Sequence, residues 1–235
     1  MIRRRSISYP FCSRIARANW IEVTEPKILP LTPNLAPILD QGNIGSCVCN
    51  AAALNVSTQS KKTINLSRIL LYVLCRINDY TSLDQDAGTT VRTCCNVLRK
   101  YGTCQEKLYP YNTNLYSVLP SVNILKNLTL FKNFTYYSVN QDINSLKQCL
   151  VTFNKPIMFG FMVYDSFLTP QVATTGIIPM PDTTKENLLG GHCVSMVGYD
   201  DNKLCFICAN SWGTSWGDKG FFYLPYNFVI NPNLA

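Results

Sequence analysis

The sequence contains eleven cysteines but a single histidine, His192, which lies in the stretch GGHCVSMVGYD. Among the cysteines, Cys47 follows the glycine-rich stretch DQGNIGS and begins a run that is typical of a helix. A cysteine attacks a carbonyl as the thiolate, and both a helix N-terminus and a neighbouring imidazolium lower the pKa of a thiol. We therefore predict that Cys47 is a nucleophile with a lowered pKa and that His192 is its acid–base partner.

Two more polar side chains could complete this chemistry. Gln41 precedes Cys47 across the turn, and its amide could donate a hydrogen bond to the oxyanion that forms at a substrate carbonyl. Asn210, in ANSWGTSWGDKG, ends the strand that follows His192, and its amide oxygen could orient the imidazole. Trp212 follows closely and could shield that hydrogen bond from water.

Helices in the first half and strands in the second must position these residues. Helical patterns occupy four stretches: 47–60, 68–77, 86–102 and 143–153. Short β-branched or aromatic runs after Pro156 indicate four strands: IMFGFMVY, HCVSMVGYD, KLCFICAN and GFFYL. Helices followed by strands predict an α+β fold or two subdomains. We expect a mainly helical domain at 29–127, which carries Cys47, and a β-rich domain at 128–235.

Three blocks of the sequence resemble the papain family of cysteine proteases: QGNIGSC, GGHCVSMVGYD and NSWGTSWGDKGFFYLP. The resemblance spans roughly residues 29–228, with the blocks in the family's order. It implies a helical L domain and a β-rich R domain with the active-site cleft between them. It also implies an endopeptidase that cleaves polypeptides through a thioester acyl-enzyme, without a cofactor. In that scheme Cys47, His192 and Asn210 form the triad, and Gln41 contributes to the oxyanion hole.

The resemblance also implies where a substrate would lie. Gly88, in DQDAG, falls where a family glycine pairs its backbone with the substrate strand. Gly160 and Cys193 fall at the pocket for the second residue before the scissile bond, and their small size leaves room for a bulky apolar side chain. Trp216 falls on the leaving-group side, and Trp212 resembles the family's shield.

Two other classes of protein stay open. A papain-like binding module without activity would keep the fold, although such modules typically lose at least one of the four residues of the catalytic set. Another Cys–His acyl-transfer enzyme, such as an amidase or a transglutaminase, also places its cysteine before its histidine. Those enzymes lack the NSWGxxWG block and usually have Asp in the third position.

Composition narrows the partners. Residues 1–30 carry four of the seven net positive charges, so we expect no basic face for nucleic acid on the folded part. No apolar run is long enough to span a bilayer. Cys205 and Cys208 are three apart on a strand, and Cys47 and Cys49 diverge on a helix, so we expect no structural zinc. The number of cysteines is odd and their spacing is irregular, which favours reduced thiols in an intracellular compartment.

The first 28 residues are expected to form a leader rather than a folded domain. They hold most of the excess charge, together with Tyr9, Phe11 and Trp20. Pro10 and Arg14 interrupt any apolar run, so we expect no secretory signal. The leader could be a flexible tail or a strap that inhibits the enzyme by lying in its own cleft. The chain is expected to act as a monomer.

Overall fold

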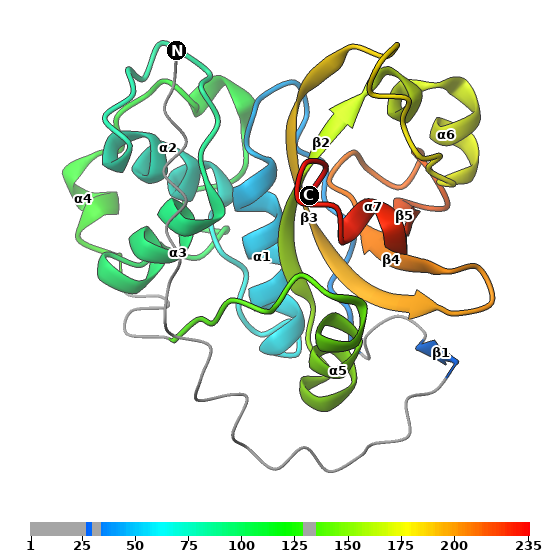
Figure 1. Ribbon diagram of the computed structural model, residues 1–235. Helices are drawn as coiled ribbons and strands as arrows, with labels where there is room; N and C mark the ends of the chain where they lie inside the picture. Colours follow the sequence, from blue (N-terminus) through cyan, green and yellow to red (C-terminus); the bar gives the residue numbers. More distant parts are fainter. Residues whose placement is uncertain (1–26, 30–33, 129–134) are drawn as a thin grey trace.

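The computed structural model describes residues 27–29, 34–128 and 135–235. Within them, a group of helices packs beside a twisted antiparallel sheet, with α1 between the two (Figure 1). The longer helices are α1 (Cys47–Gln59), α2 (Arg68–Asn78), α3 (Val91–Lys100) and α5 (Ile143–Phe153). The shorter ones are α4 (Val122–Leu125), α6 (Pro170–Thr175) and α7 (Tyr226–Val229), with 3-10 turns at Thr113–Leu115 and Asp165–Leu168. The strands are β1 (Ile28–Leu29), β2 (Ile157–Tyr164), β3 (Leu188–Asp200), β4 (Cys205–Ala209) and β5 (Phe221–Pro225).

The sheet is organised around β3. Strands β1, β2 and β4 all pair with β3, and β5 pairs with β4, each time antiparallel. The first four residues of β3 are exposed and the remaining nine are buried, because the strand passes from the surface into the space between the helices and the sheet core. His192 is the first buried residue of this strand, so it stands where the strand enters the interior.

Helix α1 is the central element of the helical half. Its residues from Val48 to Thr58 are all buried, because the helix packs on α2 and α3 on one side and on β3 on the other. Polar groups that it buries find partners: Nδ2 of Asn55 donates to Oγ of Ser195 on β3 at 2.6 Å. A helix buried on every side keeps its first residue, Cys47, in a fixed position against β3.

Local capping sets where the other long helices begin. The side chain of Ser67 accepts from the N–H of Leu70 at the start of α2, and Asp142 caps α5 in the same way. The sequence pattern predicted one helix over 86–102, but α3 begins only at Val91 because Thr90 caps it. Residues 86–90 are therefore a loop.

Of the three apolar cores among the described residues, the two larger lie on either side of α1 and β3. The helical core contains Ile69, Leu71 and Val97, and the sheet core contains Phe161, Phe206 and Phe222, among others. The combination of helices with an antiparallel sheet is the α+β architecture that the sequence predicts. Strand β1 spans the expected boundary at residue 28, and its Leu29 pairs with Tyr199 of the sheet.

Two segments bear on the expected leader and the expected domain boundary. Residues 1–26 of the expected leader, and residues 129–134 beside the expected boundary at 128, lie outside the described residues. In the part of the chain that the structure describes, no helix combines the length and apolar character needed to cross a membrane.

Candidate active site

His192 and Asn210 form the polar centre of the site. Asn210 directly follows β4, which pairs with β3 so that Ser195 lies opposite Ala209. This pairing brings the two side chains together, and Nε2 of His192 lies 2.8 Å from Oδ1 of Asn210. The bond engages Nε2 and leaves Nδ1 as the ring nitrogen that is available for proton transfer.

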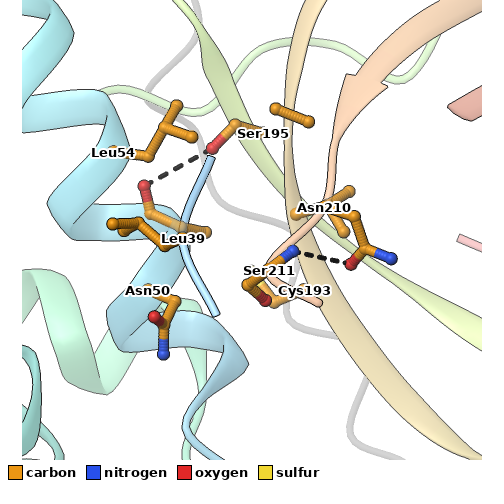
Figure 2. A pocket seen from close by; sticks show the side chains of 10 residues that line it. Leu39, Asn50, Leu54, Cys193, Ser195, Asn210 and Ser211 are labelled. Carbon is orange, nitrogen blue, oxygen red and sulfur yellow. Dashed lines mark hydrogen bonds between the residues drawn. The ribbon is translucent and has the colours of Figure 1, made fainter. Parts of the chain in front are cut away.

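The amide of Asn210 is oriented by two donors. Its Oδ1 also accepts the backbone N–H of Ser211 at 2.8 Å, as Figure 2 shows. In that view Asn210 and Ser211 face Asn50 and Leu54 of α1 across a hollow too small to admit water. Asn210 is buried, and its Nδ2 lacks a hydrogen-bond partner among the described residues. Leaving a buried donor without a partner costs about 1–3 kcal/mol. The amide keeps this orientation because the opposite one would turn Nδ2, itself a donor, towards the two donors.

Aromatic rings enclose the imidazole. Trp212 stacks on His192 with ring centroids 4.9 Å apart, and Phe161 presents an edge contact at 5.7 Å. Trp212 in turn packs against Trp216 and Phe167. Burial among these rings lowers the pKa of His192 to about 4, although the hydrogen bond to Asn210 acts in the opposite direction. Trp212 therefore lies where a shield for the His192–Asn210 bond is needed.

Gln41 is fixed through both its backbone and its side chain. Its backbone N–H donates to the carbonyl of Ser211 at 2.8 Å, and its Oε1 accepts from Oγ of Ser211 at 2.6 Å. Its Nε2 donates to the carbonyl of Ile44 at 2.8 Å. Because Nε2 carries two hydrogens, one remains for an oxyanion. Ser211 thus connects Gln41 to Asn210, a role that sequence reasoning missed although the residue stands inside the NSWG block.

Cys47 is the half-buried first residue of α1. Burial raises the pKa of its thiol, and hydrogen bonds from the backbone N–H groups of Cys193, Val48 and Cys47 itself offset this only in part. The sequence predicted a lowered pKa for Cys47, but the pKa of this thiol, considered without proton transfer to His192, is raised. The helix terminus acts in the expected direction, but the loss of water around the sulfur has the larger effect.

One cleft of about 280 Å³ collects four of the nine residues singled out by sequence, whereas Gln41, Asn210 and Trp212 lie outside its lining. Cys47 and His192 line it together, and so do Gly160 and Cys193, which are paired opposite each other on β2 and β3. Sequence reasoning missed residues 89–91 and 232–235, which also line the cleft. The latter segment is attached by a hydrogen bond of 2.7 Å from the N–H of Met162 to the carbonyl of Leu234.

Gly88 and Trp216 do not line this cleft. Gly88 has φ of 70°, a conformation that favours glycine, and its N–H donates to the hydroxyl of Tyr72 at 3.0 Å. Trp216 stacks on Phe167 with centroids 5.5 Å apart. The substrate contacts expected of these two residues stay predictions.

The burial of His192 has a measurable consequence for pH dependence. In a Cys47→Ala variant, where no thiolate can pair with the ring, the pKa of His192 should be about 4. The ordinary value is about 6.5, so between these values the unfolded chain binds a proton that the folded chain does not. The free energy of unfolding should be greatest above this window and fall by roughly 3 kcal/mol as pH drops through it.

Proton NMR can follow this titration without assignment work, because the chain has one histidine. Denaturant unfolding of the same variant at several pH values gives the matching change in stability. An imidazole that is still protonated at pH 7 in Cys47→Ala would show that burial does not dominate.

Comparisons with known proteins agree with this geometry. The family model described as "Papain family cysteine protease" matches residues 31–231. An uncharacterized peptidase C1-like protein of Acanthamoeba polyphaga mimivirus is 34% identical over 222 residues, which cover 89% of this chain and 70% of that protein. The crystal structure of xylellain, a cysteine protease from Xylella fastidiosa, superposes with a TM-score of 0.80 at 33% identity, covering 97% of this chain and 87% of that one.

A cathepsin B-like protein of Giardia intestinalis is 27% identical over 205 residues, which cover 81% of this chain and 64% of that protein. The chain spans 59% to 70% of the length of the first four curated relatives. Cys47 and His192 line one cleft, and His192 is hydrogen-bonded to the buried Asn210. The chain belongs to the papain family of cysteine proteases, with the papain-like fold, and the resemblance drawn from its three blocks is confirmed.

Proposed function

We propose that this protein is a cysteine endopeptidase that uses Cys47, His192, Asn210 and Gln41. The observation that carries the proposal is the hydrogen bond from His192 to Asn210 beside Trp212, together with the cleft that His192 and Cys47 line. Burial disfavours the charged form of both His192 and Cys47 when each is considered alone. Transfer of the thiol proton to Nδ1 creates both charges together, so each then stabilises the other.

The reaction follows from these positions. The Cys47 thiolate adds to the substrate carbonyl, and the oxyanion accepts hydrogen bonds from the free Nε2–H of Gln41 and a backbone N–H at the start of α1. Collapse of this intermediate breaks the C–N bond, and the imidazolium of His192 protonates the leaving amine. Water, deprotonated by His192, then hydrolyses the thioester and releases the acid product and the free thiol.

Incubation with E-64, followed by intact mass and peptide mapping, tests this assignment. An active enzyme should gain one E-64 adduct, and the adduct should map to Cys47. A folded protein that gains no adduct would be the inactive binding module. Labelling together with transfer of an added amine onto a glutamine donor, but without peptide hydrolysis, would favour the transglutaminase alternative.

Ser211 supplies a test of how the oxyanion donor is positioned. Ser211→Ala removes the 2.6 Å hydrogen bond from the Ser211 hydroxyl to Gln41. It keeps the two hydrogen bonds of the Ser211 backbone, one to Oδ1 of Asn210 and one from the N–H of Gln41. A bond of this kind contributes about 1 kcal/mol, so kcat should fall roughly fivefold to tenfold with little change in KM. Steady-state kinetics on a fluorogenic peptide measure this, and an unchanged kcat would remove Ser211 from the positioning network.

The preference of the cleft for bulky side chains can be tested at Gly160. A Cβ at this position would lie 3.6 Å from the carbonyl of His192, an ordinary contact, so Gly160→Ala fits without strain. The added methyl group narrows the pocket between β2 and residues 232–235. Substrates with Phe at the second position before the scissile bond should lose roughly tenfold in kcat/KM, whereas substrates with Ala there should change little.

Paired peptide substrates that differ at that one position give the comparison. Equal losses for Phe and Ala would show that Gly160 affects catalysis rather than the pocket. A peptide library in which acidic residues are preferred at this position would contradict the apolar pocket itself.

We also propose that residues 1–28 inhibit the enzyme by lying in its cleft, and that the protein works in a reducing compartment. The ten cysteines in the described part of the chain are all free thiols, which agrees with such a compartment. The start of the described chain is tied to the sheet by β1, so the preceding residues would be held near the protein at high local concentration. Removing residues 1–26 keeps β1 and should accelerate E-64 labelling; equal rates in the two proteins would make the leader a simple tail.

A further inference from the structure

Three fully buried cysteines meet inside the helical half, apart from the catalytic residues. Cys49 belongs to α1, Cys75 to α2 and Cys94 to α3, and each is 0% exposed. Their Sγ atoms all lie within 4.8 Å of one another, and none is in a disulfide. Three helices that are distant in sequence but adjacent in Figure 1 thus place three sulfur atoms at one point.

The cluster is chemically unlike ordinary apolar packing. Each of the three side chains offers one sulfur ligand atom, and the three atoms are close enough to bind a single ion. Three clustered sulfur atoms that form no disulfide therefore favour a bound cation.

We propose that Cys49, Cys75 and Cys94 form a three-coordinate binding site for Cu(I). Sulfur is a soft ligand and selects soft ions such as Cu(I) and zinc. Structural zinc almost always has four protein ligands, and no fourth His, Cys, Asp or Glu joins this group among the described residues. The full burial of the three cysteines also keeps water from serving as the fourth ligand.

The spacing suits such an ion. With metal–sulfur bonds of about 2.3 Å, a trigonal site needs sulfur atoms about 4 Å apart, which is inside the 4.8 Å limit of this cluster. Each coordinated thiol releases its proton, so affinity should rise with pH. The ion would fasten α1, α2 and α3 together two residues from Cys47, and it would stabilise the folded chain because the unfolded chain lacks the site.

The test uses the full chain carrying Cys47→Ala, which removes the reactive thiol of the cleft as a competing ligand. Under anaerobic conditions this protein should take one equivalent of Cu(I) from a chromogenic Cu(I) chelator, and its thermal midpoint should rise. X-ray absorption at the copper edge should show three sulfur neighbours. Adding Cys49→Ser, Cys75→Ser or Cys94→Ser should weaken binding at least about 100-fold.

Cys208→Ala is the matched control, since Cys208 is also fully buried but lies on β4 in the sheet core, and its Cu(I) affinity should not change. If a serine variant fails to fold, the X-ray absorption spectrum of the Cys47→Ala protein still shows whether three sulfur atoms bind the copper. Two or four sulfur neighbours, nitrogen or oxygen neighbours, or undiminished binding in Cys75→Ser would overturn the proposal. A disulfide between two of the three cysteines in the protein isolated without reductant would overturn it as well.

Discussion

Cys47→Ala should lower peptide hydrolysis by at least about 10⁴-fold while the protein stays folded. The loss is large because, among the described residues, the only other thiol that shares the cleft with His192 is Cys193, which is buried and belongs to the wall of the cleft. Alanine is well tolerated at the first turn of a helix, and the side chain it replaces is only half-buried. Fluorogenic peptide turnover, with circular dichroism as the check on folding, measures the effect.

Cys149→Ala is the matched control for this prediction. Cys149 is half-buried on α5, like Cys47 on α1, but it lines no part of the cleft. Its variant should keep the activity of the parent and its single E-64 adduct. Substantial turnover by Cys47→Ala would remove Cys47 from the role of nucleophile and leave the papain-like fold without the chemistry proposed for it.

Local sequence signals were sufficient for most of the elements that hold the site. The helix pattern at 47–60 corresponds to α1 at Cys47–Gln59, and the run IMFGFMVY is β2. Both segments are long, Gly45 comes shortly before the first and Pro156 directly before the second, so the turn residues and tertiary packing agree on where they begin. The start of α3 was wrong because the cap at Thr90 overrides the earlier helix-compatible residues.

Features that depend on contacts between residues far apart in the chain could not be predicted from the sequence. Strand β1 has two residues, and its pairing with Asp200 and Tyr199 carries no local signal. The placement of residues 232–235 at the cleft depends on the bond from Met162 to Leu234. The cysteine cluster was missed for the same reason: short spacings such as that of Cys205 and Cys208 are visible in a sequence, whereas sulfur atoms from three separate helices are not.

The pKa of Cys47 also could not be predicted from the sequence motif. The helix start and the histidine both argued for a lowered pKa of Cys47, and the N–H of Val48 acts in that direction. The amount of water that the cleft removes from the sulfur depends on how closely β3 approaches α1, a distance set by packing over the whole molecule.

His192→Ala should be nearly as damaging as Cys47→Ala, at roughly 10⁴-fold in kcat, because the chain has no second histidine to accept the thiol proton. The variant also separates activation of the nucleophile from its presence. Without the imidazole, the Cys47 thiolate forms only by losing its proton to solvent, and burial raises the pKa for that step.

Alkylation of Cys47 by iodoacetamide, followed by peptide mapping from pH 6 to pH 10, makes this distinction. In the parent protein the reaction should already be rapid at pH 6, because proton transfer to His192 supplies the thiolate. In His192→Ala it should be slow at neutral pH and increase about tenfold per pH unit towards the pKa of the isolated thiol. Asn210→Ala retains the ring and should fall between the two, since it loses the 2.8 Å bond that orients the imidazole and the bond to the N–H of Ser211 but not the proton acceptor itself. Identical pH profiles for the parent and His192→Ala would mean that the ring does not activate Cys47, even though both residues line one cleft.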